Sequence, residues 1–258
     1  MKTLDNFELN KKNIIFRADL NVPVVDGKIR DYSRIDSIIP SIDQLKKNKN
    51  KIFIIAHFGR PKGKPNKKLS LKFLCEELRL KLKDNKIHFL NSFQSEDIKK
   101  KQFEMKSGEV CLFENIRFYE QEEKNDHDFS EQLASNFEIY VNDAFSASHR
   151  KHSSIVGLPK FIPSFAGLNF TKEINNLNTF LIESKKPNLA IIGGSKISTK
   201  INVIYNLINL FDTVVIGGAM ANTFLEAKKI NVGNSIYEKE FVNIAEDILR
   251  KVKKNKCK

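Results

Sequence analysis

The chain alternates short apolar runs with longer stretches in which apolar residues return every three or four positions. In the first half, the apolar run Ile14-Ile15-Phe16 is followed by a helical pattern at 33–47. In the second half, the apolar runs of the segments AIIGG and VVIGG flank a helical pattern at 202–211. Such alternation predicts repeated β-α units and a parallel sheet. The sequence therefore predicts an α/β protein.

A change of pattern near the middle divides the chain into two parts. The stretch LPKFIPSFAG contains two prolines and a glycine, and a helical pattern closed by Pro187 follows it. A loop and a helix between two β-α patterns are typical of a domain connection. We expect a first domain at 1–167, an interdomain helix at 168–186 and a second domain at 187–258. Both domains should be Rossmann-like, with parallel strands flanked by helices.

Polar residues follow four predicted strands of the first half at the point where each strand ends. Because β-α crossovers keep one hand, the carboxyl ends of these strands share one edge, where open α/β sheets bind ligands. Arginine binds phosphate and carboxylate through two hydrogen bonds at once. One arginine after a strand is usually a surface residue, but four strand ends of this kind predict a site for a small polyanion. The residues are Arg17, Asp19 and Asn21; His57 and Arg60; Arg117; and Asn142, Asp143, His149 and Arg150.

Glycine pairs follow two predicted strands of the second half. The segments AIIGGSKISTKI and VVIGGAMANTF each place Gly-Gly before a predicted helix. Backbone N–H groups can approach an anion closely there, and a helix starting near Ser195 would put Lys196 and Lys200 on one face. The pattern suits a nucleotide polyphosphate, although it is neither GxxxxGK[ST] nor GxGxxG. Tight backbone packing explains such glycines equally well.

Two anion sites of different character favour phosphoryl transfer between them. The sequence offers no obvious general base and no covalent nucleophile. A carboxylate or phosphate acceptor needs no base, so positioning and charge neutralisation are sufficient for this chemistry.

Composition limits the other classes of function. The net charge is +13, but 36 of the 44 basic residues are lysines in polar stretches, which favours a solvated surface over a nucleic-acid partner. A basic nucleic-acid-binding protein remains the minor alternative. Three cysteines without CxxC spacing predict no metal site and a reducing, cytoplasmic location. No apolar run approaches the length of about 20 residues needed to cross a bilayer, so we expect no membrane partner.

Six segments of the chain together resemble the phosphoglycerate kinase family, in order and in spacing. The resemblance implies reversible phosphoryl transfer between 1,3-bisphosphoglycerate and ADP, giving 3-phosphoglycerate and ATP, in glycolysis. It also implies Mg²⁺ carried by the nucleotide and a monomeric enzyme. The segments are FRADLNVP, AHFGRPKG, LFENIRFYEQEEKN, YVNDAFSASHRKHSSIVGLP, GGSKISTKI and IGGAMANTFL.

The resemblance also implies roles for individual residues. Arg34 resembles the catalytic arginine that acts on the transferred phosphoryl group, and Lys196 is the second catalytic candidate. Gly193 and Gly194 resemble the phosphate loop of the nucleotide site, together with Lys196 and Lys200. The triose site maps onto Arg17, Asp19, Leu20, Asn21, Arg34, His57, Phe58, Gly59, Arg60, Arg117 and Arg150.

The sequence departs from the family at its end. It stops at DILRKVKKNKCK, where family members continue with a strand and further nucleotide-site residues. We therefore expect an incomplete second domain, and binding of 3-phosphoglycerate in preference to turnover. Two interpretations stay open: a piece of a complete kinase, which the stop before an expected strand favours, or a truncated, non-catalytic module that binds the triose phosphate.

Overall fold

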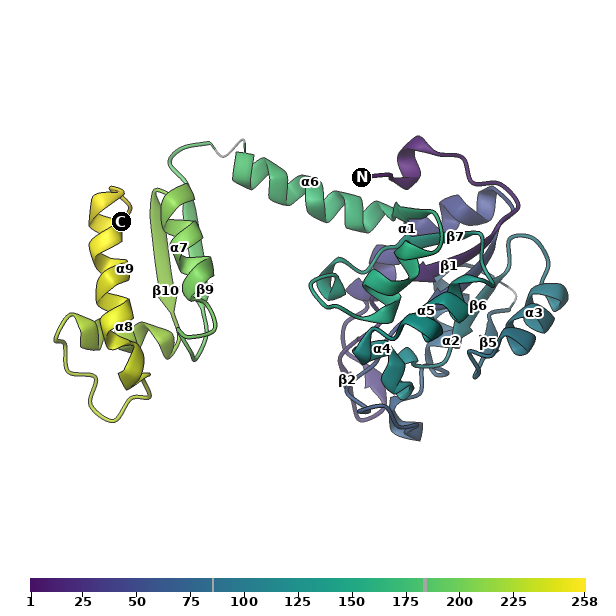
Figure 1. The fold of residues 1–258 in the computed structure, drawn as a ribbon, viewed down its shortest axis with the longest axis horizontal. Helices are drawn as coiled ribbons and strands as arrows, with labels where there is room; N and C mark the ends of the chain where they lie inside the picture. Colours follow the sequence, from purple (N-terminus) through teal and green to yellow (C-terminus); the bar gives the residue numbers. More distant parts are fainter. Residues whose placement is uncertain (85, 183–184) are drawn as a thin grey trace. The chain divides into compact units, whose positions relative to one another are not determined.

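The computed structural model describes residues 1–84, 86–182 and 185–258 (Figure 1). It divides into two compact units, Met1–Asn175 and Asn176–Lys258. The division falls inside helix α6 (Leu168–Ile182), within the stretch 168–186 where the sequence places a connection. In the described part of the chain, no helix combines the length and apolar character required to span a membrane.

A six-stranded parallel sheet forms the centre of the first unit. Its strand order is β5-β6-β4-β1-β7-β8, so β1 lies between β4 and β7, and Phe16 pairs with Ile54 and Val141. The predicted parallel α/β sheet is thereby confirmed. The strands are β1 (Asn13–Arg17), β4 (Lys51–Ile55), β5 (His88–Leu90), β6 (Val110–Phe113), β7 (Ile139–Asn142) and β8 (Ser164–Ala166), and a separate antiparallel pair is formed by β2 (Val24–Val25) and β3 (Lys28–Ile29).

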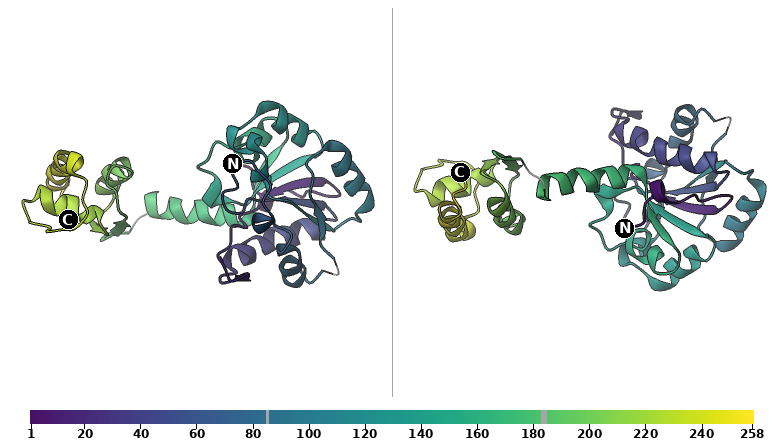
Figure 2. Two further views of the ribbon diagram at one scale, coloured as in Figure 1. Left: turned by 90° about the horizontal axis from the view of Figure 1, so that it is seen from below. Right: turned by 90° about the horizontal axis from the view of Figure 1, so that it is seen from above.

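Helices cover both faces of this sheet (Figure 2). Successive residues of a strand point to opposite faces, so Phe16 joins one hydrophobic core and Ile15 the other. Helices α1 and α2 pack into the first core, and α3 and α5 into the second. The helices are α1 (Ser33–Lys47), α2 (Leu74–Lys81), α3 (Ser95–Glu104), α4 (Glu120–Lys124) and α5 (His127–Ala134).

Short helical turns fill many of the connections between these elements. They are 3₁₀ turns apart from one π-helical turn, and one of them carries the strand-end residue Arg117. The 3₁₀ turns are Leu4–Asn6, Lys67–Leu69, Ile116–Phe118, Phe145–Ala147, Leu158–Lys160 and Lys239–Phe241, and the π turn is Ser153–Gly157.

The second unit contains a two-stranded parallel sheet with one covered and one open face. Strands β9 (Leu189–Gly193) and β10 (Thr213–Gly217) pack on one side against α7 (Ile201–Leu210), α8 (Met220–Ala227) and α9 (Val242–Lys254). On the other side Ile191 is 73% exposed, and Leu189 and Val215 are exposed beside it. Lys258 donates to Asp212 O (2.9 Å) and accepts from Val214 N (2.9 Å), which is the bonding of a parallel strand along β10.

Ile15 offers a direct test of the central strand. Its side chain is completely buried in the middle of β1. We expect Ile15→Ala to lower the free energy of unfolding of the first unit by about 2–5 kcal/mol, because it leaves a cavity in a close-packed core. Urea denaturation followed by circular dichroism measures the loss. Leu80→Ala on α2, where the side chain is 56% exposed, is the matched control and should change little; equal losses in the two variants would contradict the assigned core.

Candidate functional site

The carboxyl edge of the first sheet gathers four of the predicted basic side chains. Arg17 ends β1 and is 1% exposed, and its Nη2 lies 3.1 Å from His57 Nδ1 just past β4. Arg117, in the turn after β6, donates from Nη1 to the carbonyl oxygen of Gly59 (2.9 Å). Arg150 is half-buried, and its charge acts on both His57 and Arg117. Four strand ends thus contribute to one electropositive edge.

A buried polar network holds the guanidinium group of Arg17. Its Nε donates to Ser154 Oγ (2.9 Å), and that hydroxyl donates to Glu122 Oε1 (2.6 Å). Burial alone would raise the pKa of Glu122, but hydrogen bonds from His152 and Ser154 and the charge of Arg17 outweigh it and lower the pKa. The carboxylate therefore stays ionised as the buried counter-charge of Arg17.

His57 carries no charge in this setting. Burial, reinforced by the guanidinium groups of Arg17, Arg117 and Arg150, lowers the pKa of His57 to about 2. Arginine can only donate, so Nδ1 accepts the bond from Arg17 and the ring proton sits on Nε2. His57 is thus a neutral hydrogen-bonding group, and the positive charge at this edge comes from the arginines.

Two guanidinium nitrogens of Arg117 have no hydrogen-bond acceptor among the described residues. It is 3% exposed, and its Nη2 has no acceptor among the residues that the structure describes. Its Nε has only an ion pair with Glu123 at 3.2 Å, without hydrogen-bond geometry. A buried donor without an acceptor costs free energy. An oxyanion bound beside Arg117 would remove that cost.

Arg34 reaches the same edge from the first turn of α1. Its Nη1 donates to Asp19 Oδ2, which also accepts from the Ser146 hydroxyl. Asn21 Oδ1 accepts from the backbone N–H of Gly59 (2.9 Å) and so joins the loops after β1 and β4. Arg34 and Asp19 border a cavity of about 390 Å³, whose lining is Asp19, Ser33, Arg34, Ser37, Asp143, Phe145, Ser146, Asn169 and Glu173.

The side chains of several other predicted site residues are not held at this edge. The Leu20 side chain is completely buried in the core, so only its backbone can serve a ligand. Phe58 packs against the core of α1 and α2, on the face opposite to His57. Arg60 and His149 are exposed, and within the described ranges the Arg60 side chain has no hydrogen bond or ion pair. Arg60 is therefore near the edge in sequence, but no hydrogen bond or ion pair within the described part of the chain fixes its side chain there.

Asp143 is held by hydrogen bonds to groups other than the arginines. Its carboxylate accepts from Ser41 Oγ (2.6 Å) and from the backbone N–H of Phe170 (2.8 Å), in the first turn of α6. Burial raises the pKa of Asp143 to about 6. A Cβ atom at Gly167 would lie 2.3 Å from this carboxyl group, so glycine is required there. The strand-end aspartate thus anchors helix α6, although it also borders the 390 Å³ cavity beside Arg34.

The glycine pairs of the second unit lie next to one another at the ends of β9 and β10. Gly193 pairs with Gly217, and a Cβ atom at Gly218 (φ +72°) would lie 2.7 Å from Gly194 O. The Lys200 side chain passes over Gly194, since a Cβ atom there would lie 3.2 Å from Lys200 Cε. These loops and this ammonium group fit a phosphate chain.

The predicted helix start near Ser195 is wrong, because α7 begins at Ile201. The preceding segment forms a turn in which Ile197 is fully buried and Lys200 N donates to Ile197 O (2.8 Å). Glu238 holds this turn by accepting from Ser198 N (2.9 Å) and Ser198 Oγ (2.7 Å). Lys196 and Lys200 are therefore placed by a turn and not by one helical face.

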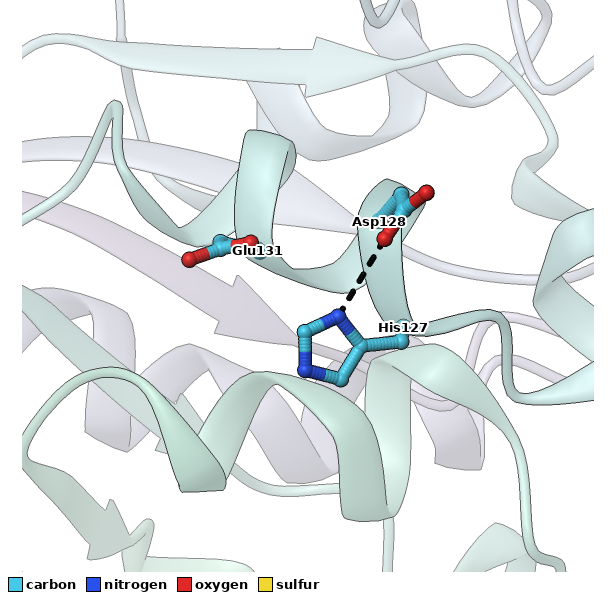
Figure 3. A group of neighbouring side chains, drawn as sticks. All are labelled: His127, Asp128 and Glu131. Atoms are coloured by element: carbon cyan, nitrogen blue, oxygen red, sulfur yellow. Dashed lines mark hydrogen bonds and ion pairs between the residues drawn. The ribbon is translucent and has the colours of Figure 1, made fainter.

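Among the described residues, one group of metal-type ligands lies close together, formed by His127, Asp128 and Glu131 on α5 (Figure 3). The His127 Nδ1 atom lies 3.3 Å from Asp128 Oδ1, and all three side chains are exposed. Exposed acidic groups often lie together without an ion, so we assign no metal to them.

Comparison with known proteins decides the family. A family model for phosphoglycerate kinase matches residues 4–258. The chain belongs to the phosphoglycerate kinase family. The phosphoglycerate kinase of Brucella melitensis is 43% identical over 256 residues, which are 99% of this chain and 64% of that protein. That of Chelativorans is 44% identical over 249 residues, covering 96% and 62% of the two chains.

Solved structures agree with this membership of the phosphoglycerate kinase family. The enzyme of Coxiella burnetii superposes with a TM-score of 0.85 at 33% identity, over 98% of this chain and 64% of that one. The enzyme of Pyrococcus horikoshii gives 0.81 at 28% identity, over 99% and 64%. The chain therefore spans a little under two thirds of the length of the phosphoglycerate kinases that it matches.

Sequence reasoning missed the residues that support the site. Glu122 stands in the acidic run EQEEK, which reads as a solvated helix, and Ser154 and Glu238 stand in polar loops. Only their distant partners in the fold make them structural. The motif YVNDAFSASHRKHSS contains Ser146 and Ser154 but gives no sign of what they bind.

The charge state of His57 can be measured. We expect its ring to stay neutral in the folded protein from pH 8 to pH 5, because protonation would add a buried charge beside arginines. Nitrogen-15 NMR of the imidazole rings, with the signal assigned by its loss in His57→Gln, measures this. In urea the same ring should titrate near 6.5.

The difference between the pKa of His57 in the folded and in the unfolded chain predicts how stability changes with pH. The unfolded chain takes up a proton at His57 that the folded chain does not, so this group lowers the free energy of unfolding as pH falls below about 6.5, by about 1.4 kcal/mol per unit. A ring that titrates above pH 5 in the folded protein would contradict the assignment.

Proposed function

We propose that this chain provides the triose-phosphate site of a phosphoglycerate kinase and part of its nucleotide site. The reaction would be phosphoryl transfer between 1,3-bisphosphoglycerate and ADP, giving 3-phosphoglycerate and ATP, which is a step of glycolysis. The enzyme would be a monomer in the cytoplasm. The observation that carries the proposal is the edge where the charges of Arg17, Arg117 and Arg150 act on neutral His57, with Arg117 Nη2 lacking an acceptor among the described residues. Phosphate and carboxylate are the anions that such guanidinium groups bind best.

The proposed roles follow from how each group is held. Arg117 and Arg150 would bind the anionic ends of the triose. Arg17, locked by Ser154 and Ala18 O, would position His57 and add charge without moving. Arg34, held by Asp19 at the border of the 390 Å³ cavity, would neutralise the phosphoryl group during transfer. Transfer to a carboxylate needs only this positioning and charge neutralisation.

On the nucleotide side, the loops at Gly193, Gly194 and Gly218 would receive the phosphate chain through backbone N–H groups. Lys200, which lies over Gly194, would bind the phosphates, and Lys196 would add a second charge. The nucleotide would bring Mg²⁺, which neutralises charge on the phosphates. The chain spans about 64% of its relatives, so we propose that it binds 3-phosphoglycerate and falls below the turnover of about 1–100 per second typical of kinases.

Binding of 3-phosphoglycerate tests the triose site in the chain as it is. We expect Arg150→Ala to weaken binding about tenfold or more, because a charge-assisted hydrogen bond is lost. Isothermal titration calorimetry measures the dissociation constant. Arg79→Ala is the matched control, since Arg79 is paired with Glu76 on the surface of α2, and it should leave affinity unchanged. If wild-type chain binds no 3-phosphoglycerate, or both variants behave alike, the proposal is wrong.

Kinetics separate the proposed role of Arg34 from simple binding. In a chimera that joins this chain to the remaining third of the Brucella melitensis enzyme, we expect Arg34→Ala to lower kcat on the order of a hundredfold while KM for the triose hardly changes. A contact made only in the transition state behaves in this way. Lys200→Ala should raise KM for ATP as well. An Arg34→Ala variant with normal kcat and a raised triose KM would make Arg34 a binding residue only.

A further inference from the structure

A second groove lies on the first unit beside the loop that follows β4. It has a volume of about 980 Å³, which is in the range of sites for small organic molecules. The loop 65–73 forms one wall, and the β2–β3 hairpin contributes to the lining. The lining residues are Val24, Gly27, Phe58, Pro65, Asn66, Lys67, Lys68, Ser70, Lys72, Phe73, Glu114 and Phe118.

Aromatic side chains line the apolar part of this groove. The rings of Phe58 and Phe73 lie 5.4 Å apart at an angle of 58°, and Phe118 adds a third ring. Phe73 is 39% exposed and Val24 is 36% exposed, so apolar surface faces solvent here. Clustered exposed apolar side chains with a polar rim are typical of a binding site.

Uncompensated positive charge surrounds the rings. Lys67, Lys68 and Lys72 line the groove, and in the described ranges none of them has an ion pair. The groove also contains the carboxylate of Glu114, but this group is already engaged in three hydrogen bonds within the protein. It accepts from Ser70 Oγ (2.7 Å), Leu71 N (2.8 Å) and Asn115 N (2.8 Å). The ammonium groups are therefore free to meet an anion from outside.

The groove is separate from the proposed triose site. Along the segment from β4, Ile52, Ile54 and Ala56 belong to the core under α1 and α2, and Phe58 packs on that same core. His57, by contrast, faces Arg17, which Ser154 holds on the opposite side. Alternation along the strand thus directs the two neighbouring residues to two different sites.

We propose that this groove binds a small aromatic anion, a planar ring system that carries a phosphate, sulfonate or carboxylate group. The ring would pack on Phe73 and Phe58, and the anionic group would meet Lys68 and Lys72. An uncharged aromatic molecule would leave the three ammonium groups unused, and a small anion such as phosphate would leave the rings exposed. The groove combines both features, and neither is used in the proposed kinase reaction.

Binding of 8-anilinonaphthalene-1-sulfonate, an aromatic sulfonate, tests this proposal on the full chain by fluorescence titration. We expect Phe73→Ala and the combined variant Lys67→Gln, Lys68→Gln, Lys72→Gln each to weaken binding about tenfold. The three lysines are exposed, so we expect the combined variant to keep its fold. Phe103→Ala, at a 91% exposed phenylalanine on α3 outside the groove, is the matched control and should change nothing.

Two further arms locate the probe. All titrations use the Ile191→Ser background, which reduces binding to the open face of β9 and β10. The uncharged N-phenyl-1-naphthylamine should bind at least tenfold more weakly and should not respond to the lysine variant. Saturating 3-phosphoglycerate should leave the affinity for the sulfonate probe unchanged, because the groove is separate from the proposed triose site. This arm tests whether the two sites overlap and does not test the kinase function. Unchanged affinity in Phe73→Ala, equal binding of the uncharged probe, or displacement by 3-phosphoglycerate would overturn the proposal.

Discussion

The structure of the first unit depends on burying one guanidinium group at the end of its central strand. An unpaired buried charge is too costly to persist, so the elements around Arg17 are arranged to compensate it. The π turn at Ser153–Gly157 brings Ser154 to Nε, and helix α4 brings the ionised Glu122 beneath it. The loop after β4 supplies a neutral imidazole as the third partner. One charge thus fixes the positions of a turn, a helix and a loop that come from distant parts of the sequence.

This arrangement separates rigid from adaptable groups at the same edge. Arg17 and Glu122 are buried and have all their partners, whereas Arg150 is half-buried and Arg60 is exposed. Asp143, which follows β7, connects the edge to the first turn of α6 by accepting from the backbone N–H of Phe170. The strand ends therefore serve two purposes: some groups are prepared for an anion, and one fixes the helix in which the chain divides into its two units.

The sequence predicts the sheet well, because strands buried on both faces are continuous apolar runs, as IIF in β1 and FII in β4 show. It also predicts that polar groups from several strands meet at one edge, since parallel strands place their carboxyl ends together. It does not predict the supports. The acidic run around Glu122 has the composition of a solvated helix, and its burial depends on Ser154, 32 residues away. The sequence pattern also places the start of α7 too early, because Glu238, 40 residues away, holds Ser198 in a turn.

The large positive charge of the chain opposes association through the open face of β9 and β10. Exposed Leu189, Ile191 and Val215 on a short sheet promote association between copies, as unprotected strand edges also do. A net charge of +13 opposes this association by electrostatic repulsion between whole molecules. That repulsion weakens as added salt shortens the Debye length to about 3 Å at 1 M. We therefore expect the colloidal stability of this chain to depend on its lysines and to decline as ionic strength rises.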